Sequence, residues 1–339
     1  MPKRLIFVAA SVLVSGIFLV IALNGVPFAE VIDGIRQAQI GWVIVGFGGL
    51  WLAAAARAVR WRILIGSQVS LLGFYHSNNM TNFLNLLPLR AGEVGRTLAL
   101  STRYGVPLVT AATSVIVERL IDLVMIIVML ALGLAGIADI PPTIAQTSLL
   151  FGAVAVVGLL ILIGLARFPT AAHRIFTTLE TRIPILHRVG LLTRLEEMLN
   201  GLAILTDLRR LFLTLIWSII AWAASGLVVF PLILALGIFP PGSDAINLTL
   251  LTVPLVSFSI AIPVSVASLG PWEGAVRLAG DLLGVAPTQA TTLGFLFHGV
   301  SAFGYVFFGV ISLLAMGITL GEVLAPRRPE PTAASPEQG

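Results

Sequence analysis

The sequence contains no cysteine and few charged residues, and both absences narrow the kind of protein it encodes. Without cysteine there is no disulfide, no thiolate metal site and no cysteine nucleophile. Charged residues make up 11% of the 339 residues, against about 25% in a soluble globular domain. Hydrophobic residues make up 58%. This composition predicts an all-α polytopic membrane protein rather than a water-soluble one.

The basic residues do not indicate nucleic-acid binding. The formal net charge is +4, but lysine and arginine are spread along the chain and form no patch interleaved with aromatic side chains. We therefore expect no nucleic-acid partner. Only His298 among the histidines falls at predicted membrane depth, and no His-x-x-x-His or Asp-x-x-Asp spacing occurs. We expect no metal site, no cofactor and no pair of nucleophile and general base.

Six long apolar segments predict transmembrane helices, since roughly twenty residues cross the hydrocarbon core of a bilayer. The first follows Lys3 and Arg4 and lacks the small-x-small site of a cleaved signal peptide, so we interpret it as an uncleaved span. The others are Ile40–Ala56, Pro107–Gly136, Ser148–Ala166, Leu211–Gly237 and Thr288–Leu320.

Two further apolar stretches, Leu71–Leu100 and Asn247–Gly284, are interrupted by prolines and glycines. The interruptions are at Pro88, Gly92, Pro263, Gly270 and Pro271. The resulting halves are too short to span, and irregular backbone persists at membrane depth only where it is buried in protein or lines a cavity. We interpret both stretches as re-entrant helical hairpins.

The distribution of basic residues predicts the orientation. With both termini in the cytoplasm, most arginines and lysines fall on the cytoplasmic side, including Arg57, Arg60 and Arg62 behind the second span. The predicted outer connections hold only Arg36. This asymmetry predicts a multi-pass protein of the cytoplasmic (inner) membrane with cytoplasmic N- and C-termini.

We expect a single membrane domain over residues 1–324, with repeat halves at about 1–137 and 148–320. The polar insertion 168–207 has leucines at helical spacing and predicts an amphipathic helix. That helix lies either on the inner leaflet or on the protein's own cytoplasmic face. The proline-rich polar tail 325–339 is typical of a disordered cytoplasmic segment.

The two interrupted stretches resemble each other. "RAGEVGR" in the first corresponds to "LGPWEGAVR" in the second, and each is followed by a Gly-Val step and a long apolar span. Glu93 precedes Arg119 by 26 residues, and Glu273 precedes His298 by 25. An odd number of crossings per half would invert the second copy. Inverted repeats of this kind build substrate sites between the halves of secondary transporters.

Ionisable residues at membrane depth mark a candidate site by default. Glu118 lies roughly 17 Å into its span at about 1.5 Å per residue. Asp122 shares its helix face, while Arg119 points about 100° away. An unpaired arginine is costly there, so Arg119 pairs with Glu93 or Glu273 or holds an anionic ligand.

Three arginines lie in or beside the hairpins: Arg90, Arg96 and Arg277. A guanidinium suits bidentate contact with phosphate, and a half-helix starting after Gly92 or Gly270 would add free N–H groups. The alternative is a buried salt-bridge cluster that only fixes hairpin to helix. His298 is either a satisfied core histidine or a working one.

Trp272 is either an interfacial anchor or a stacking wall. The expected substrate-binding set is Arg90, Glu93, Arg96, Glu118, Arg119, Asp122, Trp272, Glu273, Arg277 and His298.

The segments "NNMTNFLNLLPLRAGEVGRTLAL", "SVIVERLIDLV" and "IPVSVASLGPWEGAVRLAGDLLGV" resemble the signature segments of the flippase-like, or lysylphosphatidylglycerol synthase transmembrane-domain, family. The resemblance runs from about Leu5 to Leu320 and implies a standalone member without the soluble synthase domain. It points to Arg90, Glu93, Arg96, Glu118, Arg119, Asp122 and Glu273. Many members carry Pro-Gly-Gly-Leu-Gly where this chain has "VASLGPWEG", a departure that could alter the head group accepted.

The resemblance and the charged constellation together predict a lipid translocase. It would move an anionic or zwitterionic phospholipid, or a polyprenyl-phosphate-linked lipid, between leaflets. Two alternatives stay open: a membrane-embedded enzyme acting on lipid head groups, and a non-catalytic membrane partner of a soluble synthase or glycosyltransferase. The expected partners are membrane lipids, and the oligomeric state is left open.

Overall fold

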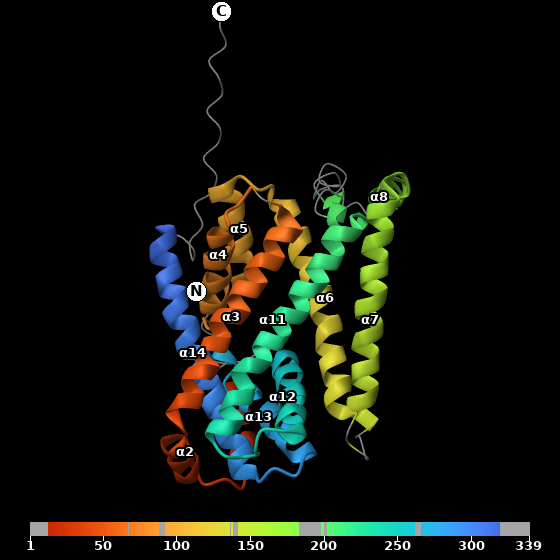
Figure 1. The fold of residues 1–339 in the computed structure, drawn as a ribbon. Coiled ribbons are helices and arrows are strands. Elements are labelled where there is room, and N and C mark those ends of the chain that lie inside the picture. Colours follow the sequence, from red (N-terminus) through yellow and green to blue (C-terminus); the bar gives the residue numbers. More distant parts are fainter. Residues whose placement is uncertain are drawn as a thin grey trace, which may run out of the picture.

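The computed structural model describes residues 13–66, 68–87, 92–135, 137, 142–182, 198–199, 202–261 and 266–318. All regular secondary structure in this part of the chain is helical, which confirms the predicted all-α class (Figure 1). Pro88 and Pro263, most of the predicted amphipathic helix in 168–207 and the tail 325–339 lie outside the described residues.

The first half contains the helix Leu13–Ala22, α2 (Phe28–Gln37), α3 (Ile40–Ile65), α4 (Leu71–Leu84), α5 (Gly92–Tyr104) and α6 (Leu108–Leu134). It is followed by α7 (Pro142–Arg167), α8 (Pro169–Arg182) and the 3₁₀-helix η2 (Ala203–Thr206). The second half contains α11 (Leu208–Ala235), α12 (Ser243–Ala261), the 3₁₀-helix η3 (Val266–Ser268), α13 (Pro271–Leu282) and α14 (Pro287–Met316).

Four of the described helices are long and apolar enough to cross a membrane, namely α3, α11, α12 and α14. Together, α7 and α8 give a fifth candidate that is bent by 107°. Helix α6 has 27 residues, but Glu118, Arg119 and Asp122 interrupt its apolar sequence. The chain is therefore a multi-pass membrane protein, and the part that the structure describes holds four to five candidate spans by length and composition.

Two of the predicted segment lengths are wrong. α12 has 19 residues, so the first arm of the second interrupted stretch is long enough to span. α3 continues past Ala56 to Ile65 because no glycine or proline interrupts it before Gly66. Arg57 and Arg60 therefore lie inside a helix and not in a cytoplasmic loop.

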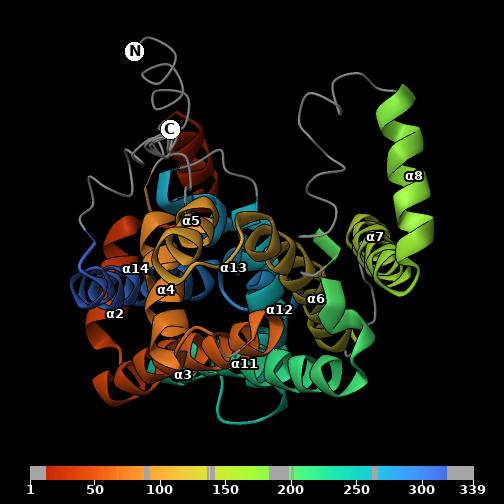
Figure 2. The same cartoon turned by 90° about the horizontal axis from the view of Figure 1, so that it is seen from above.

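Glycines bring α3 and α11 into backbone contact. The two helices run side by side along one edge of the molecule (Figure 2). A Cβ at Gly49 would lie 2.7 Å from the carbonyl oxygen of Leu227, and one at Gly46 would lie 2.9 Å from that of Val228. Small residues allow such close packing between membrane helices, where water supplies no hydrophobic driving force.

The remaining contacts pair helices of one half with helices of the other. α4 packs against α14, and α12 packs against α6. The pair α4–α5 lies toward one end of the molecule and the pair α12–α13 toward the opposite end (Figure 1). The core therefore includes side chains from both halves, and the space between them contains the candidate site.

Candidate functional site

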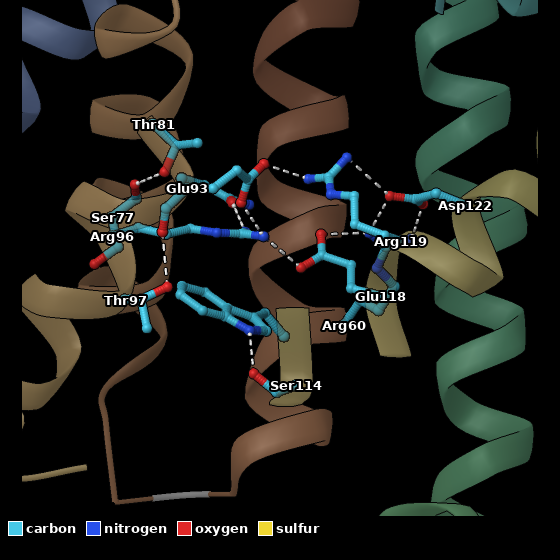
Figure 3. A network of polar contacts seen from close by, with 12 residues as sticks. Arg60, Ser77, Thr81, Glu93, Arg96, Thr97, Ser114, Glu118, Arg119 and Asp122 are labelled. Atoms are coloured by element: carbon cyan, nitrogen blue, oxygen red, sulfur yellow. Dashed lines mark hydrogen bonds and ion pairs between the residues drawn. The ribbon is translucent and has the colours of Figure 1, made fainter. Parts of the chain in front are cut away.

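Three arginines and three carboxylates from α3, α5 and α6 form a closed ring of ion pairs (Figure 3). The members of this ion-pair ring, in the order of their contacts, are Arg60, Glu118, Arg96, Glu93, Arg119 and Asp122. Each cation contacts two carboxylates and each carboxylate contacts two cations. The ring therefore carries no net charge.

Arg60 holds the two carboxylates of α6. Its Nη2 donates to Glu118 Oε1 at 2.6 Å, and its Nη1 donates to Asp122 Oδ1 at 2.5 Å. The Arg60 side chain is 0% exposed and that of Glu118 is 1% exposed. Ser218 and Trp222 of α11 contribute further, because Ser218 Oγ accepts from Arg60 at 3.2 Å and Trp222 Nε1 donates to Asp122 Oδ1 at 3.0 Å. The spacing of Glu118 and Asp122, four residues apart on one helix face, lets one guanidinium reach both.

Arg96 links the hairpin to α6. Its Nη2 lies 2.9 Å from Glu118 Oε2 and 2.7 Å from Glu93 Oε2. Its Nη1 donates to Asn78 Oδ1 of α4 at 3.1 Å, and its guanidinium lies 4.3 Å from the ring centroid of Trp61. A cation over an indole face is stabilised by the ring quadrupole. Arg96 is thus held by side chains of four helices, namely α3, α4, α6 and its own α5.

Arg119 closes the ring on its accessible side. Its Nη2 donates to Glu93 Oε1 at 2.7 Å. Of the two expected partners, Glu93 and Glu273, Arg119 therefore contacts Glu93. Its Nη1 lies 3.5 Å from Asp122 Oδ2. The Arg119 side chain is 53% exposed, whereas Arg60 and Arg96 are buried.

The ring borders a cavity of about 660 Å³, which is within the size range of ligand sites. Its walls come from both halves. Polar side chains of α4 contribute from the first half, and Ser225, Ser257, Trp272 and Tyr305 contribute from the second. Apolar residues including Leu50 and Val228 complete the lining.

Arg57 also lines this cavity and was missed as a site residue in the sequence. Its Nη2 donates to Ser225 Oγ at 2.8 Å, and its guanidinium lies 5.8 Å from the ring centroid of Trp222. Among the described residues, no carboxylate lies within ion-pair distance of it. The apolar pattern that continues beyond Arg57 to Ile65 is the signal that could have placed it, together with Arg60, inside a helix.

A second polar group in the other half joins α13 to α14. Glu273 Oε1 lies 2.6 Å from His298 Nδ1, and Glu273 Oε2 accepts from the Gly270 N–H at 2.7 Å. His298 Nε2 lies 3.1 Å from the carbonyl oxygen of Ala267. A carbonyl oxygen only accepts, so Nε2 carries a proton, and a second proton is shared between Nδ1 and the carboxylate. The histidine is satisfied by partners on both sides.

Trp272 stacks on His298, with ring centroids 4.8 Å apart and an interplanar angle of 12°. Trp272 also lines the cavity. Of its two expected roles, interfacial anchor or stacking wall, this position favours the stacking wall. At both half-helix starts the glycine N–H itself has a side-chain acceptor. Gly92 N donates to Asn85 Oδ1 at 3.1 Å, and Gly270 N is bound by Glu273.

Three of the predicted site residues are not among the described residues that line the cavity, namely Glu273, Arg277 and His298. Arg277 Nη1 donates to the carbonyl oxygens of Ala22 and Asn24 at 3.3 Å and 2.9 Å, and Arg277 is not among the described residues that line the cavity. Its Nε lies 3.9 Å from Asp281. Arg90 lies outside the described residues. The described cluster therefore centres on α3, α5 and α6.

A family model described as the lysylphosphatidylglycerol synthase TM region matches residues 8–309. No curated protein and no solved structure matches the chain.

Proposed function

The chain belongs to the lysylphosphatidylglycerol synthase TM-region family, and we propose that it is a lipid translocase. It moves the polar head group of an anionic or zwitterionic phospholipid, or of a polyprenyl-phosphate-linked lipid, between the two leaflets. The observation that carries the proposal is the cavity of about 660 Å³, which has a charged wall and is lined by helices of both halves. Polar surface of this kind among apolar helices provides a path for a group that the hydrocarbon excludes.

The position of the charged wall supports transport across the membrane. Glu118 is close to the middle of α6, which runs from Leu108 to Leu134. If α6 crosses the bilayer, Glu118 of the ring lies roughly 15 Å from the start of the helix at about 1.5 Å per residue. A head group at that depth is near the midplane, where secondary transporters place their substrate.

The helix contacts support an inverted repeat in which α4–α5 of the first half corresponds to α12–α13 of the second. In such a repeat, α4 corresponds to α12 and α6 corresponds to α14. The contact of α4 with α14 then corresponds to the contact of α12 with α6, and the structure contains both. The carboxylate in the first turn of α5 pairs with Arg119 on α6, and Glu273 in the first turn of α13 pairs with His298 on α14. The two hairpins lie at opposite ends (Figure 1). In this arrangement, rocking of the halves opens the cavity to alternate leaflets.

We further propose that the protein is in the cytoplasmic membrane with both termini in the cytoplasm, as the distribution of basic residues supports. A lipid is the partner that we propose, and the charged wall of the cavity supports it. A soluble synthase or glycosyltransferase is a second candidate partner. Co-purification of such a partner, together with no activity of the present protein when it is alone, would favour this alternative.

Transport can be tested through the cavity itself. The chain contains no cysteine, so a single introduced cysteine is the only labelling site. Ser257→Cys places that site in the cavity wall, and Leu160→Cys places it on α7, where the native leucine is 61% exposed. The protein is reconstituted in liposomes, and exchange of tail-labelled phosphatidylglycerol and phosphatidylcholine between leaflets is followed before and after a bulky maleimide is added.

We expect the label at position 257 to stop exchange and the label at position 160 to leave it unchanged. Wild-type protein that exchanges no lipid faster than protein-free liposomes would contradict the proposal. Mass analysis of the same lipids separates transport from catalysis, since a chemically altered head group would favour the enzyme.

A further inference from the structure

Among the described residues, the charges at the cavity do not cancel once Arg60, which is buried and does not line it, is counted with the ring. The ion-pair ring contains three arginines and three carboxylates and is neutral. Arg57 stands beside it, lines the same cavity, and has a serine hydroxyl and an indole face as its described contacts. A guanidinium among membrane helices is costly unless an anion or a backbone carbonyl partners it. One positive charge in the cavity wall therefore has no counter-ion among the described residues.

We infer that a lipid phosphodiester supplies this counter-ion, and that the cavity selects a lipid whose head group carries one net negative charge. This inference rests on the proposed lipid translocase. The phosphodiester contacts Arg57, whose planar fork matches two phosphate oxygens. The glycerol-type remainder of the head group occupies the space lined by the serines and amides of α4, α11 and α12.

Charge balance separates this lipid class from three others. A zwitterionic head group brings an ammonium, but each of the three carboxylates that line the cavity already contacts two arginines. An aminoacylated head group with a net positive charge adds to the charge of Arg57 instead of neutralising it. A polyprenyl diphosphate brings more negative charge than one guanidinium balances. Burying the uncompensated charge that remains in each case costs free energy.

The hydrogen-bonding groups of the wall favour the same ligand chemistry. Asn78 Oδ1 is occupied by Arg96, and the Asn78 Nδ2 is a buried donor with no acceptor among the described residues. The Trp272 Nε1 is a second buried donor of this kind. Both residues line the cavity. A phosphodiester accepts hydrogen bonds without donating any, so it suits these two unpaired donors.

The inference predicts both a lipid preference and the residue that causes it. The probe is a tail-labelled phosphatidylglycerol bound to the purified full chain in detergent micelles. The competitors are unlabelled phosphatidylglycerol, phosphatidylcholine, lysylphosphatidylglycerol and a polyprenyl diphosphate. We expect phosphatidylglycerol to compete about tenfold better than each of the others, which corresponds to one charge-assisted contact.

Variants of Arg57 identify the origin of the preference. Arg57→Gln removes the charge and should abolish the preference, while Arg57→Lys keeps the charge and should retain part of it. Arg62→Gln is the matched control, because Arg62 is exposed on the same helix. Native elution and an unchanged unfolding midpoint for Arg57→Lys show that the variant is folded.

The outcomes separate this inference from the proposed function. Equal competition by phosphatidylcholine or lysylphosphatidylglycerol, or a preference that persists in Arg57→Gln, would overturn the charge-balance inference. If the same protein still exchanges lipids in liposomes, the translocase proposal stands without it. If no lipid is exchanged, the translocase proposal fails whatever the competition shows.

Discussion

Arg60 is the residue whose removal should damage the fold most, because it is fully buried and holds two carboxylates. Its Nη2 lies 2.6 Å from Glu118 Oε1 and its Nη1 lies 2.5 Å from Asp122 Oδ1. The exposed fraction of the side chain is 0% for Arg60, 1% for Glu118 and 8% for Asp122. Replacing Arg60 by methionine leaves the three carboxylates of the ring with two arginine partners, since Arg57 is not within ion-pair distance of any of them. Breaking a buried ion pair by removing one partner costs about 3–5 kcal/mol, so we expect Arg60→Met to lose this much free energy of unfolding.

A second substitution tests whether the loss arises from charge imbalance. Arg60→Met combined with Asp122→Asn restores neutrality, since Glu118, Arg96, Glu93 and Arg119 remain as an alternating chain. Asparagine keeps an oxygen that can accept from Trp222. We expect the double variant to recover roughly half of the loss, a coupling of a size seen between residues in one network.

The assay is reversible unfolding of the purified protein in mixed micelles, with the free energy of unfolding extrapolated to zero denaturant. Arg62→Met serves as the control, because Arg62 is exposed on the same helix. A double variant no more stable than Arg60→Met would refute the reasoning from charge balance. An Arg60→Met protein as stable as the Arg62→Met control would refute the burial argument as well.

Three further outcomes follow from local contacts and are read in the same unfolding assay. Gly49→Ala should cost about 1–3 kcal/mol by overpacking α3 against α11, whereas Gly48→Ala, with no atom within 4 Å of the added Cβ, should not destabilise; equal losses would contradict the packing. Asp207→Ala should cost about 1 kcal/mol, because the Asp207 carboxylate caps α11 by accepting from two backbone N–H groups; an unchanged midpoint would count against the cap. Glu273→Gln keeps an acceptor for the Gly270 N–H and a donor for the imidazole, so it should leave the free energy of unfolding nearly unchanged. Glu273→Ala leaves His298 without this partner and should lower the free energy of unfolding by about 1–3 kcal/mol. A glutamine variant less stable than the alanine variant would refute the assigned protons.

The charged part of the site that lies on α6 could be predicted from the sequence. Glu118, Arg119 and Asp122 interrupt a long apolar segment, and intramembrane charges are conspicuous for that reason. The contact of Arg119 with Glu93 was one of two expected pairings. Helical spacing also placed Glu118 and Asp122 on one face, which is the face that Arg60 contacts.

Arg57 and Arg60 could not be recognised in the same way. Both occur near the end of an apolar run, where arginines usually mark the cytoplasmic end of a span. The sequence up to Ile65 is compatible with a longer helix, but only the three-dimensional packing shows that this part of α3 lies against α6 and α11. Arg277 shows the opposite error, because its neighbours in sequence belong to the site while its long side chain reaches the carbonyl oxygens of Ala22 and Asn24.

The most direct test of the account is the initial rate at which tail-labelled phosphatidylglycerol changes leaflets in liposomes that contain the purified protein. The account predicts exchange at least about tenfold faster for the wild type than for Arg57→Gln, with the Arg62→Gln control equal to the wild type. Wild-type protein that exchanges this lipid no faster than protein-free liposomes would contradict the account.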